Sequence, residues 1–385
     1  MLGSDFSVGI VADWLVTSAG SESVVKELIN IYPSSELFSL IDFISEEERN
    51  DYSGKKAKTT FIQKLPFVKK NYQIFLPLMP FAVEQIDVSS HNVIISSCHA
   101  VSKGVLTGPD QLHISYVHSP MRYAWDLQHQ YLKETGLSKG LKGLIVKWLL
   151  HKIRIWDYRT AHGVDHMVAN SHFIARRIKK VYGRDADVIY PPVHVERFAL
   201  NTHKENFYIT ASRLVPYKRV DLIVEAFRRM PDKKLIVIGD GPEMKKVIRH
   251  TSENVSVLGY QPDDVLQDLM GRAKAFVFAA EEDFGIVVVE AQACGTPIIA
   301  YGRGGALETV RPYGSQNATG VFFHEQTPEH IMSAVEKFES IQDDLLPENC
   351  RSNALRFSAH RFREEFSAYL KDKWINFQEL KKITY

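Results

Sequence analysis

The sequence predicts an α/β protein built from two doubly wound domains, each a parallel sheet covered by helices. Three observations predict this class. Short apolar runs alternate with longer segments of helical periodicity along nearly all of the 385 residues. Several of the apolar runs end in a glycine-containing turn that leads into a helix. A chain of this length usually forms two domains, each with its own core.

The composition gives no sign of a polyanionic partner. Hydrophobic residues make up 45% of the chain and charged residues 24%, and the net charge is only +1. This balance gives no reason to expect binding to nucleic acid. Cys98, Cys294 and Cys350 lie far apart and lack metal-ligand spacing. We therefore expect reduced thiols, a cytoplasmic location and no metal site.

The first residues are not expected to form a signal peptide. Asp5, and no basic residue, precedes the first apolar run. No apolar run approaches the ~20 residues that a membrane-spanning helix needs. We therefore expect no transmembrane segment.

The first half is expected to begin as strand, glycine turn and helix. Residues 6–12 are apolar, and a helix with one apolar face starts near Gly20. A glycine at that position lets a ligand approach the backbone closely. An ordinary tight turn is the alternative for a lone glycine. Further strands are expected at 37–40, 92–97, 112–117, 166–169 and 188–190.

His118 directly follows the strand expected at 112–117 and is itself followed by Ser119 and Pro120. Ligands of open α/β sheets bind outside the carboxyl ends of the strands. His118 is therefore placed where such a sheet binds ligands, although many single histidines are structural. The aromatic and polar stretch 125–132 is either an acceptor surface or a packed helix.

Two basic segments of the first half contain no acidic residue. Segment 52–83 has six lysines interleaved with aromatic residues, and segment 137–154 has helical spacing with lysines largely off its apolar face. Such segments suit an anionic membrane surface, at ~1 kcal/mol per lysine near the surface. A solvated loop over a buried helix, and a helix that faces the core, are the alternatives.

The second half alternates strand and helix from about residue 207 onward, after a linker near 195–203. A strand at 207–211 leads to a loop with Arg213 and Lys218, and other strands are expected at 235–238, 255–258 and 276–280. We expect the domain boundary between residues 198 and 199.

Residues 281–300, EEDFGIVVVEAQACGTPIIA, organise this half as loop, helix, turn and strand. Glu282 lies on the loop, and Glu290 lies within the apolar helix that follows. The helix N-terminus offers free N–H groups and a positive dipole to a ligand. A charge within an apolar helix needs a partner, which is either a hydroxyl-rich ligand or an arginine or backbone group elsewhere.

Several motifs together resemble the family-4 retaining glycosyltransferases of the GT-B fold. In the second half the matching stretches are SRLVPYKRVD (212–221), GDGPE (239–243), EDFGIVVVEAQACGTPIIA (282–300) and RGGALE (303–308). In the first half they are Gly20 with Glu22, HSP (118–120), NS (170–171) and YPPV (190–193). Residues 79–132 resemble the mannosyltransferases that build lipopolysaccharide O-antigens.

The resemblance implies two Rossmann-like domains that face a cleft. The first would be an acceptor-binding domain at 1–198, with the last helix, 366–385, crossing back to pack on it. The second would bind the nucleotide sugar at 199–365. The family needs neither a metal nor another cofactor, since the sugar nucleotide is a substrate.

The resemblance also assigns roles to individual residues. Arg213 and Lys218 would hold the diphosphate, Glu282 the donor-sugar hydroxyls and Glu290 the ribose. The remaining donor contacts would be Gly20 with the diphosphate, His118 with the donor sugar, backbone N–H groups of Phe284, Gly285 and Ile286 with the sugar, and Leu258, Gly259 and Tyr260 with the base. One departure is that the family's glycine pair at the first turn is here Ala19-Gly20.

The implied reaction is transfer of a mannosyl residue from GDP-mannose to a lipid-linked glycan, with retention, in O-antigen biosynthesis at the inner face of the cytoplasmic membrane. The leaving phosphate would act as the base, without a protein nucleophile. UDP-glucose, UDP-galactose or GDP-fucose are alternative donors. A sugar-nucleotide epimerase or hydrolase, or a non-catalytic partner in a polymer-building complex, are alternative functions.

Overall fold

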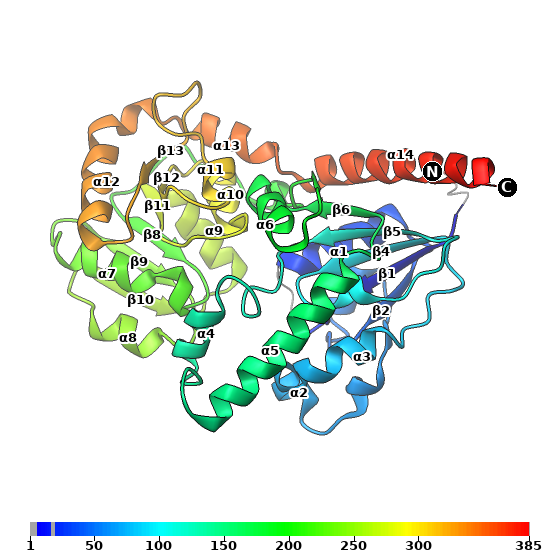
Figure 1. Ribbon diagram of the computed structural model, residues 1–385. Helices are drawn as coiled ribbons and strands as arrows, with labels where there is room; N and C mark the ends of the chain where they lie inside the picture. The colour runs from blue at the N-terminus through cyan, green and yellow to red at the C-terminus, as the bar shows by residue number, and fades with distance from the viewer. Residues whose placement is uncertain (1–5, 17–19, 385) are drawn as a thin grey trace. The chain divides into compact units, whose positions relative to one another are not determined.

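The computed structural model describes residues 6–16 and 20–384, and it divides into two compact units. The N-terminal unit is Met1–Pro192 with Phe362–Tyr385, and the C-terminal unit is Val193–Arg361. Each unit has a parallel sheet with its own hydrophobic core, as the sequence predicts. Figure 1 shows the chain order of the elements.

The division lies slightly earlier than the boundary expected at 198/199. The backbone N–H of Val193 donates to the carbonyl of Phe357 at 2.9 Å, and the N–H of Ala359 donates to the carbonyl of Val193 at 3.0 Å. Arg351 donates to the carbonyls of Val195 at 2.8 Å and Phe198 at 2.7 Å. These contacts fix residues 193–198 to the C-terminal unit, and a local sequence pattern does not reveal them.

The described part of the N-terminal unit has a seven-stranded parallel sheet in the order β3-β2-β1-β4-β5-β6-β7. Apolar side chains cover both faces of this sheet, so that the strands are buried runs rather than alternating ones. The strands are β1 (Val8–Ala12), β2 (Glu36–Ser39), β3 (Lys58–Thr59), β4 (Val93–Cys98), β5 (Leu112–Val117), β6 (His166–Ala169) and β7 (Asp187–Val188).

The helices of this unit differ widely in length. The α-helices are α1 (Gly20–Ile31), α2 (Val68–Asn71), α3 (Met79–Val83), α4 (Gln128–Glu134), α5 (Gly140–Thr160), α6 (His172–Tyr182) and α14 (Ala359–Thr384). The 3-10 helices are η1 (Glu48–Tyr52), η2 (Phe61–Lys64), η3 (Tyr72–Leu78) and η4 (Ser102–Gly104). The basic segment 52–83 is therefore a series of short helical turns rather than one helix.

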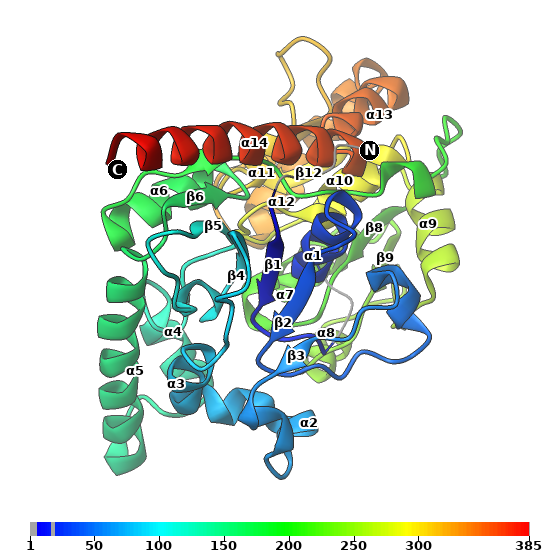
Figure 2. The same cartoon turned by 90° about the vertical axis from the view of Figure 1, so that its right-hand side faces the viewer.

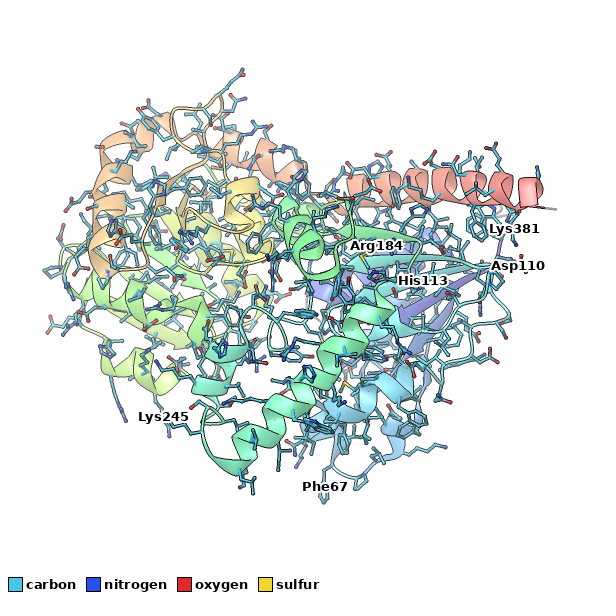
Figure 3. The ribbon with its side chains drawn as sticks, viewed as in Figure 1. Phe67, Asp110, His113, Arg184, Lys245 and Lys381 are labelled. Carbon is cyan, nitrogen blue, oxygen red and sulfur yellow. The ribbon has the colours of Figure 1, made fainter. Side chains whose placement is uncertain are left out.

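Helix α14 lies along the N-terminal unit in both views (Figures 1 and 2). Phe362 and Phe366 are fully buried, and their rings lie 5.8 and 6.5 Å from the ring of Tyr116 on β5. Near the other end, Lys381 pairs with Asp110 at 2.6 Å (Figure 3). The expected return of the last helix to the first domain is thus confirmed.

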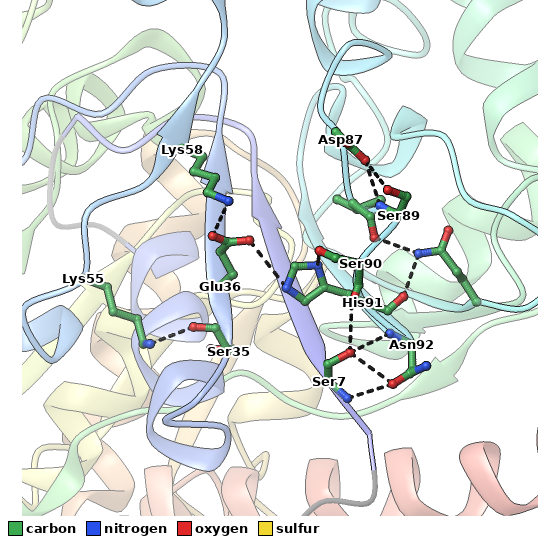
Figure 4. A network of polar contacts seen from close by, with 12 residues as sticks. Ser7, Ser35, Glu36, Lys55, Lys58, Asp87, Ser89, Ser90, His91 and Asn92 are labelled. Atoms are coloured by element: carbon green, nitrogen blue, oxygen red, sulfur yellow. Dashed lines mark hydrogen bonds and ion pairs between the residues drawn. The ribbon is translucent and has the colours of Figure 1, made fainter.

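A polar network closes the amino ends of β1, β2 and β4 (Figure 4). Glu36 pairs with Lys58 and lies 3.6 Å from Nε2 of His91. The N–H of Ser7 donates to Oδ1 of Asn92 at 3.1 Å, and the N–H of Asn92 donates to Oγ of Ser7 at 3.0 Å. These contacts occupy the amino edge, so a ligand site is expected at the opposite, carboxyl edge of the sheet.

The C-terminal unit has a six-stranded parallel sheet in the order β10-β9-β8-β11-β12-β13. Its strands are β8 (Tyr208–Ala211), β9 (Leu235–Ile238), β10 (Val255–Gly259), β11 (Ala275–Phe278), β12 (Ile298–Tyr301) and β13 (Gly320–Phe323). Its helices are α7 (Val220–Arg228), α8 (Met244–Arg249), α9 (Asp263–Arg272), α10 (Ile286–Ala293), α11 (Ala306–Thr309), α12 (Pro328–Ile341) and α13 (Pro347–Leu355), with 3-10 helices η5 (Val195–Arg197), η6 (Pro216–Lys218) and η7 (Gln342–Asp344).

The strand order reverses direction once in each sheet. The reversal lies between β1 and β4 in the N-terminal unit and between β8 and β11 in the C-terminal unit. The connections that leave the two strands at such a point diverge and open a crevice at their carboxyl ends, where doubly wound sheets bind ligands. This topology directs the search for a site to the loops after β8 and β11, and after β1 and β4.

Candidate functional site

The reversal point of the C-terminal unit brings together residues that lie far apart in sequence. The loop after β8 carries Arg213 and Lys218, and the loop after β11 carries Glu282. Because β8 and β11 are paired neighbours, Nζ of Lys218 forms an ion pair with Oε1 of Glu282. Lys218 was expected to hold the diphosphate and Glu282 the sugar hydroxyls, and the structure shows that the two side chains contact each other.

The Lys218–Glu282 pair is well shielded. The side chains are 12% and 16% exposed, and the ammonium lies 5.9 Å from the centre of the Phe278 ring. Arg213 on the same loop is exposed. No carboxylate pairs with its guanidinium within residues 6–16 and 20–384. The loop therefore presents one cation that is held by a carboxylate and one that remains available to an anion.

Glycines of the GDGPE motif support the loop that carries Arg213. A Cβ on Gly239, whose φ is 130°, would lie 1.8 Å from the carbonyl oxygen of Ser212. A Cβ on Gly241 would lie 2.4 Å from the carbonyl oxygen of Leu214. The N–H of Leu214 donates to the carbonyl of Asp240 at 2.9 Å. The sequence identified this motif as a glycine loop but missed its supporting role.

The glycine pair of RGGALE supports the Glu282 loop in the same way. A Cβ on Gly304 would lie 2.3 Å from the carbonyl oxygen of Glu282, and a Cβ on Gly305 would lie 2.3 Å from Cα of Phe284. The N–H of Gly305 donates to the carbonyl of Glu282 at 2.7 Å. Both charged loops are therefore set by direct backbone packing against a second, glycine-bearing loop.

Helix α10 begins beside Glu282. Gly285 precedes it with φ 85°, in the left-handed region that favours glycine. Phe284 is buried and packs edge-to-face on Phe357, with ring centres 5.3 Å apart, so its side chain is committed to the core. In the first helical turn the N–H of Val288 donates to the carbonyl of Gly285 at 3.0 Å. The N–H of Ile286, at the first helical position, has no acceptor within the helix and favours an anion or a hydroxyl oxygen.

Glu290 lies on α10 and is partly buried. Burial, followed by the nearby Asp263 carboxylate, raises its pKa to about 7, and Arg197 opposes this shift. Arg197 itself donates to Asp263 at 2.9 Å. No side chain among the described residues donates a hydrogen bond to the Glu290 carboxylate. Arg197 therefore acts on this carboxylate electrostatically without a hydrogen bond, and the contact of Glu290 with a ligand stays a prediction.

The expected base-contacting residues lie at the carboxyl end of β10, where Leu258 and Gly259 end the strand and Tyr260 follows it. Leu258 and Tyr260 are exposed, and Gly259 has φ 71° with no atom within 4 Å of where a Cβ would be. The N–H of Gly239 donates to the carbonyl of Gly259 at 2.8 Å, which ties this turn to the loop that supports Arg213. An exposed apolar surface at this edge suits the face of a planar ring.

His118 leaves the carboxyl end of β5 in the N-terminal unit. Its Nε2 lies 2.8 Å from Oγ of Ser97, and its backbone N–H donates to the carbonyl of Cys98 at 2.8 Å. Burial, and then the neighbouring His99, lower the pKa of His118 to about 3. The ring is therefore neutral near pH 7 and suits hydrogen bonding to a hydroxyl rather than charge stabilisation.

Gly20 is the first residue of α1, after the carboxyl end of β1. This placement agrees with the helix N-terminus that the sequence predicts. The other half of the expected glycine position, Ala19, lies outside the described residues.

Asp13 lies just after β1, is buried, and is not among the residues predicted from the sequence. Its carboxylate accepts four backbone N–H groups of residues 99–102, at 2.7, 2.9, 2.6 and 2.6 Å. It also lies 3.1 Å from Nδ1 of His99. A small pocket beside it is lined by Trp14, Glu22 and His99, among others. A buried carboxylate after the first strand was the available signal.

Within the described residues, no group of three or more His, Cys, Asp or Glu side chains could hold a metal ion. Nor does any described helix combine the length and apolarity needed to cross a bilayer.

Nearly all of the C-terminal unit matches a known protein family. Residues 192–357 match the family described as glycosyl transferases group 1. An uncharacterized glycosyltransferase of Methanocaldococcus jannaschii is 24% identical over 343 residues, which cover 88% of each chain. A GDP-mannose-dependent monoacylated alpha-(1-6)-phosphatidylinositol monomannoside mannosyltransferase of Corynebacterium glutamicum is 30% identical over 223 residues, 50% of this chain and 55% of the relative.

Solved structures share the fold over most of the chain. HepE of Anabaena in complex with UDP has a TM-score of 0.70 at 16% identity, over 95% of this chain and 100% of that one. The apo form of the lipopolysaccharide outer core galactosyltransferase WaaB has a TM-score of 0.65 at 17% identity, over 95% and 99%. At these identities the likeness shows the fold, and it confirms the expected GT-B class.

Proposed function

We propose that the chain, which carries a group 1 glycosyltransferase domain over residues 192–357, transfers a mannosyl residue from GDP-mannose to a lipid-linked glycan with retention. The observation that carries this proposal is the cluster at the β8–β11 reversal point. There the exposed Arg213 and the Lys218–Glu282 pair lie on the loops after two neighbouring strands. Glu290 lies on the helix that follows the Glu282 loop, and no described side chain donates a hydrogen bond to it.

The cluster has the charges that a nucleoside diphosphate sugar needs. Arg213 and Lys218 would neutralise the charge that grows on the departing diphosphate, the role that a metal ion has in other transferases. Glu282 and Glu290 would accept hydrogen bonds from sugar and ribose hydroxyls. The Lys218–Glu282 pair keeps both side chains in place before the donor arrives, so little reorganisation is needed.

The proposed chemistry needs no titrating protein base. The acceptor hydroxyl attacks from the face that the diphosphate leaves, and a leaving phosphate oxygen takes its proton. His118 is neutral at working pH, because its pKa is about 3, and its proposed role is a hydrogen bond to a sugar hydroxyl. The anomeric configuration is retained in this reaction.

GDP-mannose is proposed because the Corynebacterium relative, 30% identical over half of this chain, is GDP-mannose-dependent by description. UDP-glucose, UDP-galactose and GDP-fucose remain alternative donors, and HepE has been solved with UDP and with UDP-glucose. The proposed acceptor is an intermediate of lipopolysaccharide O-antigen synthesis. No metal or other cofactor is part of the proposal.

A transfer assay tests the function. Purified protein is incubated with radiolabelled GDP-mannose and with lipid-linked glycans extracted from an O-antigen-producing strain, and the label in the lipid fraction is measured. Labelled lipid with an α-mannosyl linkage supports the proposal. Turnover of the donor that is equally fast without acceptor would instead indicate a hydrolase or an epimerase.

Donor affinity is expected to depend on pH through Glu290. The pKa of about 7 means that the carboxyl group is largely protonated at pH 6 and ionised at pH 8. If only the carboxylate accepts both ribose hydroxyls, the Kd for GDP-mannose is about tenfold higher at pH 6 than at pH 8. Calorimetric titration measures this, and GDP-mannose is preferred to GDP because its diphosphate has no proton that titrates in this range.

The matched control is Glu290→Gln, which keeps the size of the side chain and removes the titration. The Kd of this variant for GDP-mannose is expected to be higher than that of the wild type at pH 8, and to stay constant between pH 6 and pH 8. A wild-type Kd that does not change over this range would remove Glu290 from the donor site.

We also propose that the N-terminal unit binds the inner face of the cytoplasmic membrane through a basic-apolar surface, formed by segments 52–83 and 137–154. Phe67, at φ 62°, is 79% exposed and projects from the unit (Figure 3). Leu141, Leu144 and Trp148 are exposed on α5, so this face does not pack on the core. In the sequence both groups lie among lysines, and neither segment contains an acidic residue.

Reversing two charges of this surface is expected to weaken vesicle binding. Lys64 and Lys70 are exposed, and each lysine near an anionic surface contributes ~1 kcal/mol. The double variant Lys64→Glu/Lys70→Glu is expected to bind vesicles rich in phosphatidylglycerol at least about tenfold more weakly in a sedimentation assay. Unchanged binding would indicate that segment 52–83 is a solvated loop without a membrane-binding role.

Lys245→Glu provides the control, because Lys245 is exposed on the C-terminal unit (Figure 3). Its vesicle binding is expected to match that of the wild type. Neutral phosphatidylcholine vesicles should bind all three proteins weakly.

A further inference from the structure

A buried carboxylate in the N-terminal unit ties together three connections that leave the carboxyl edge of its sheet. Asp157 lies in the last turn of α5 and is 0% exposed. Its Oδ1 pairs with Nζ of Lys103, which is 2% exposed and lies on η4, just after β4. This pair is independent of the donor cluster, and neither the motifs nor the proposed chemistry uses it.

The second oxygen of Asp157 accepts two more donors. Nε1 of Trp125, in the loop after β5, donates to Oδ2 at 2.7 Å. The hydroxyl of Tyr182, at the end of α6 after β6, donates to the same oxygen at 2.9 Å. One carboxylate therefore holds the segments that follow β4, β5 and β6.

The surroundings of Lys103 favour its charged form. Burial disfavours a charged Lys103, but the Asp157 carboxylate, together with Cys98 and Asp13, opposes this effect, and the pKa of Lys103 is raised. The ammonium also lies 5.8 Å from the Trp156 ring centre and 5.1 Å from that of Tyr182. A buried ion pair stabilises a fold little compared with apolar packing of the same volume. The Lys103–Asp157 pair lies near the carboxyl edge of the sheet, where ligands bind, so a role other than stability is expected for it.

The loop that Trp125 anchors is the one that starts at His118. Between them, Met121 and Ala124 are buried, and Arg154 of α5 donates to the carbonyl of Ala124 at 2.7 Å. The loop has no strand or α-helix of its own between β5 and α4. Backbone turns such as the bond from the N–H of Trp125 to the carbonyl of Met121, at 3.1 Å, shape the loop locally. The indole bond of Trp125 to the buried Asp157 carboxylate is one of the side-chain contacts that tie the loop to the rest of the unit.

We infer that Asp157 is a positioning residue, which fixes the loop at residues 119–127 through Trp125 and so orders the acceptor-binding edge of the N-terminal unit. This inference rests on the proposed function for the acceptor, but the ordering of the loop can be measured without it. Asp157 and Lys103 contact no substrate in this account and act only through the loop.

The test compares three single variants. Trp125→Phe removes the indole donor to Asp157 and leaves the Lys103 pair intact. Tyr182→Phe removes a donor from the same oxygen, but on α6. Trp156→Phe makes the same substitution on α5, where Nε1 of Trp156 donates to Glu84 at 2.8 Å instead. All three lose one hydrogen bond to a carboxylate, and only the first releases the loop.

Amide hydrogen exchange is measured first. In Trp125→Phe, residues 119–127 are expected to exchange at least about tenfold faster than in the wild type, while both control variants keep wild-type rates there. Unchanged exchange in Trp125→Phe, or equal acceleration in all three variants, would overturn the positioning role whatever reaction the protein catalyses.

Kinetics then connect the loop to the reaction. The value of kcat/KM for the acceptor is expected to fall about tenfold in Trp125→Phe and less than twofold in the controls, whereas the Kd for GDP-mannose stays at the wild-type value in all three. Faster exchange with unchanged acceptor kinetics would contradict the link between the loop and the acceptor. Absence of transfer by the wild type would contradict the proposed function and leave the exchange result standing.

Discussion

Replacing Lys218 with alanine is expected to lower the rate of sugar transfer about a thousandfold, since removal of one preorganised stabiliser of transition-state charge costs about a hundred- to a thousandfold. Two losses combine here. The departing diphosphate loses a cation, and Glu282 loses the partner that orients it. The rate is measured with saturating donor and acceptor, and the folded state is checked by circular dichroism.

Lys246→Ala is the matched control for this prediction. Lys246 also lies in the C-terminal unit and pairs with Asp221 at 2.9 Å and with Glu243 at 3.1 Å, but its side chain is half exposed. An exposed ion pair contributes little to the stability of a fold. The rate of transfer by this variant should therefore stay within about twofold of the wild-type rate. Near-normal transfer by Lys218→Ala would remove Lys218 from the site.

The substitution Gly239→Ala is expected to have the second largest effect. A methyl group there would lie 1.8 Å from the carbonyl oxygen of Ser212, and the φ of 130° is itself unfavourable for alanine. The backbone that carries Arg213 must move to relieve this contact. We expect a loss of about 2–4 kcal/mol in the free energy of unfolding, together with transfer reduced more than about a hundredfold.

Gly314→Ala separates backbone strain from the steric contact. Gly314 has φ 92°, but nothing lies within 4 Å of where its Cβ would be. This variant should be slightly destabilised and should keep its transfer rate. If Gly239→Ala loses only stability and transfers at the wild-type rate per folded molecule, the supporting role of the glycine loop is wrong.

Much of the fold was predictable because buried parallel strands have a simple signature. Apolar runs such as 112–117 and 235–238 coincide with β5 and β9. The domain division was less accessible, since the hydrogen bonds of Val193 and Arg351 join residues more than 150 positions apart. Helix α5 shows another limit, because its apolar spacing does not say which face meets the core.

The site was predictable as a set of residues but not as an arrangement. The motifs identify Lys218 and Glu282, yet their ion pair exists because β8 and β11 are neighbours, and local patterns do not specify strand order. The same holds for the glycines at 239 and 304, whose importance depends on backbone from another loop. Asp13 and Asp157 were missed because their partners come from several distant segments.

The most direct test of the central claim is nucleotide binding at the β8–β11 reversal point. Thermal stability of the wild type and of Lys218→Ala is measured with GDP, UDP, GDP-mannose and UDP-glucose, since a ligand of the folded state raises the melting temperature according to its concentration relative to Kd. We predict a clear rise with GDP and GDP-mannose in the wild type, and little or none in Lys218→Ala. A rise with the uridine compounds alone would keep the site and change the donor. No rise with any nucleotide, or an equal rise in both proteins, would contradict the account.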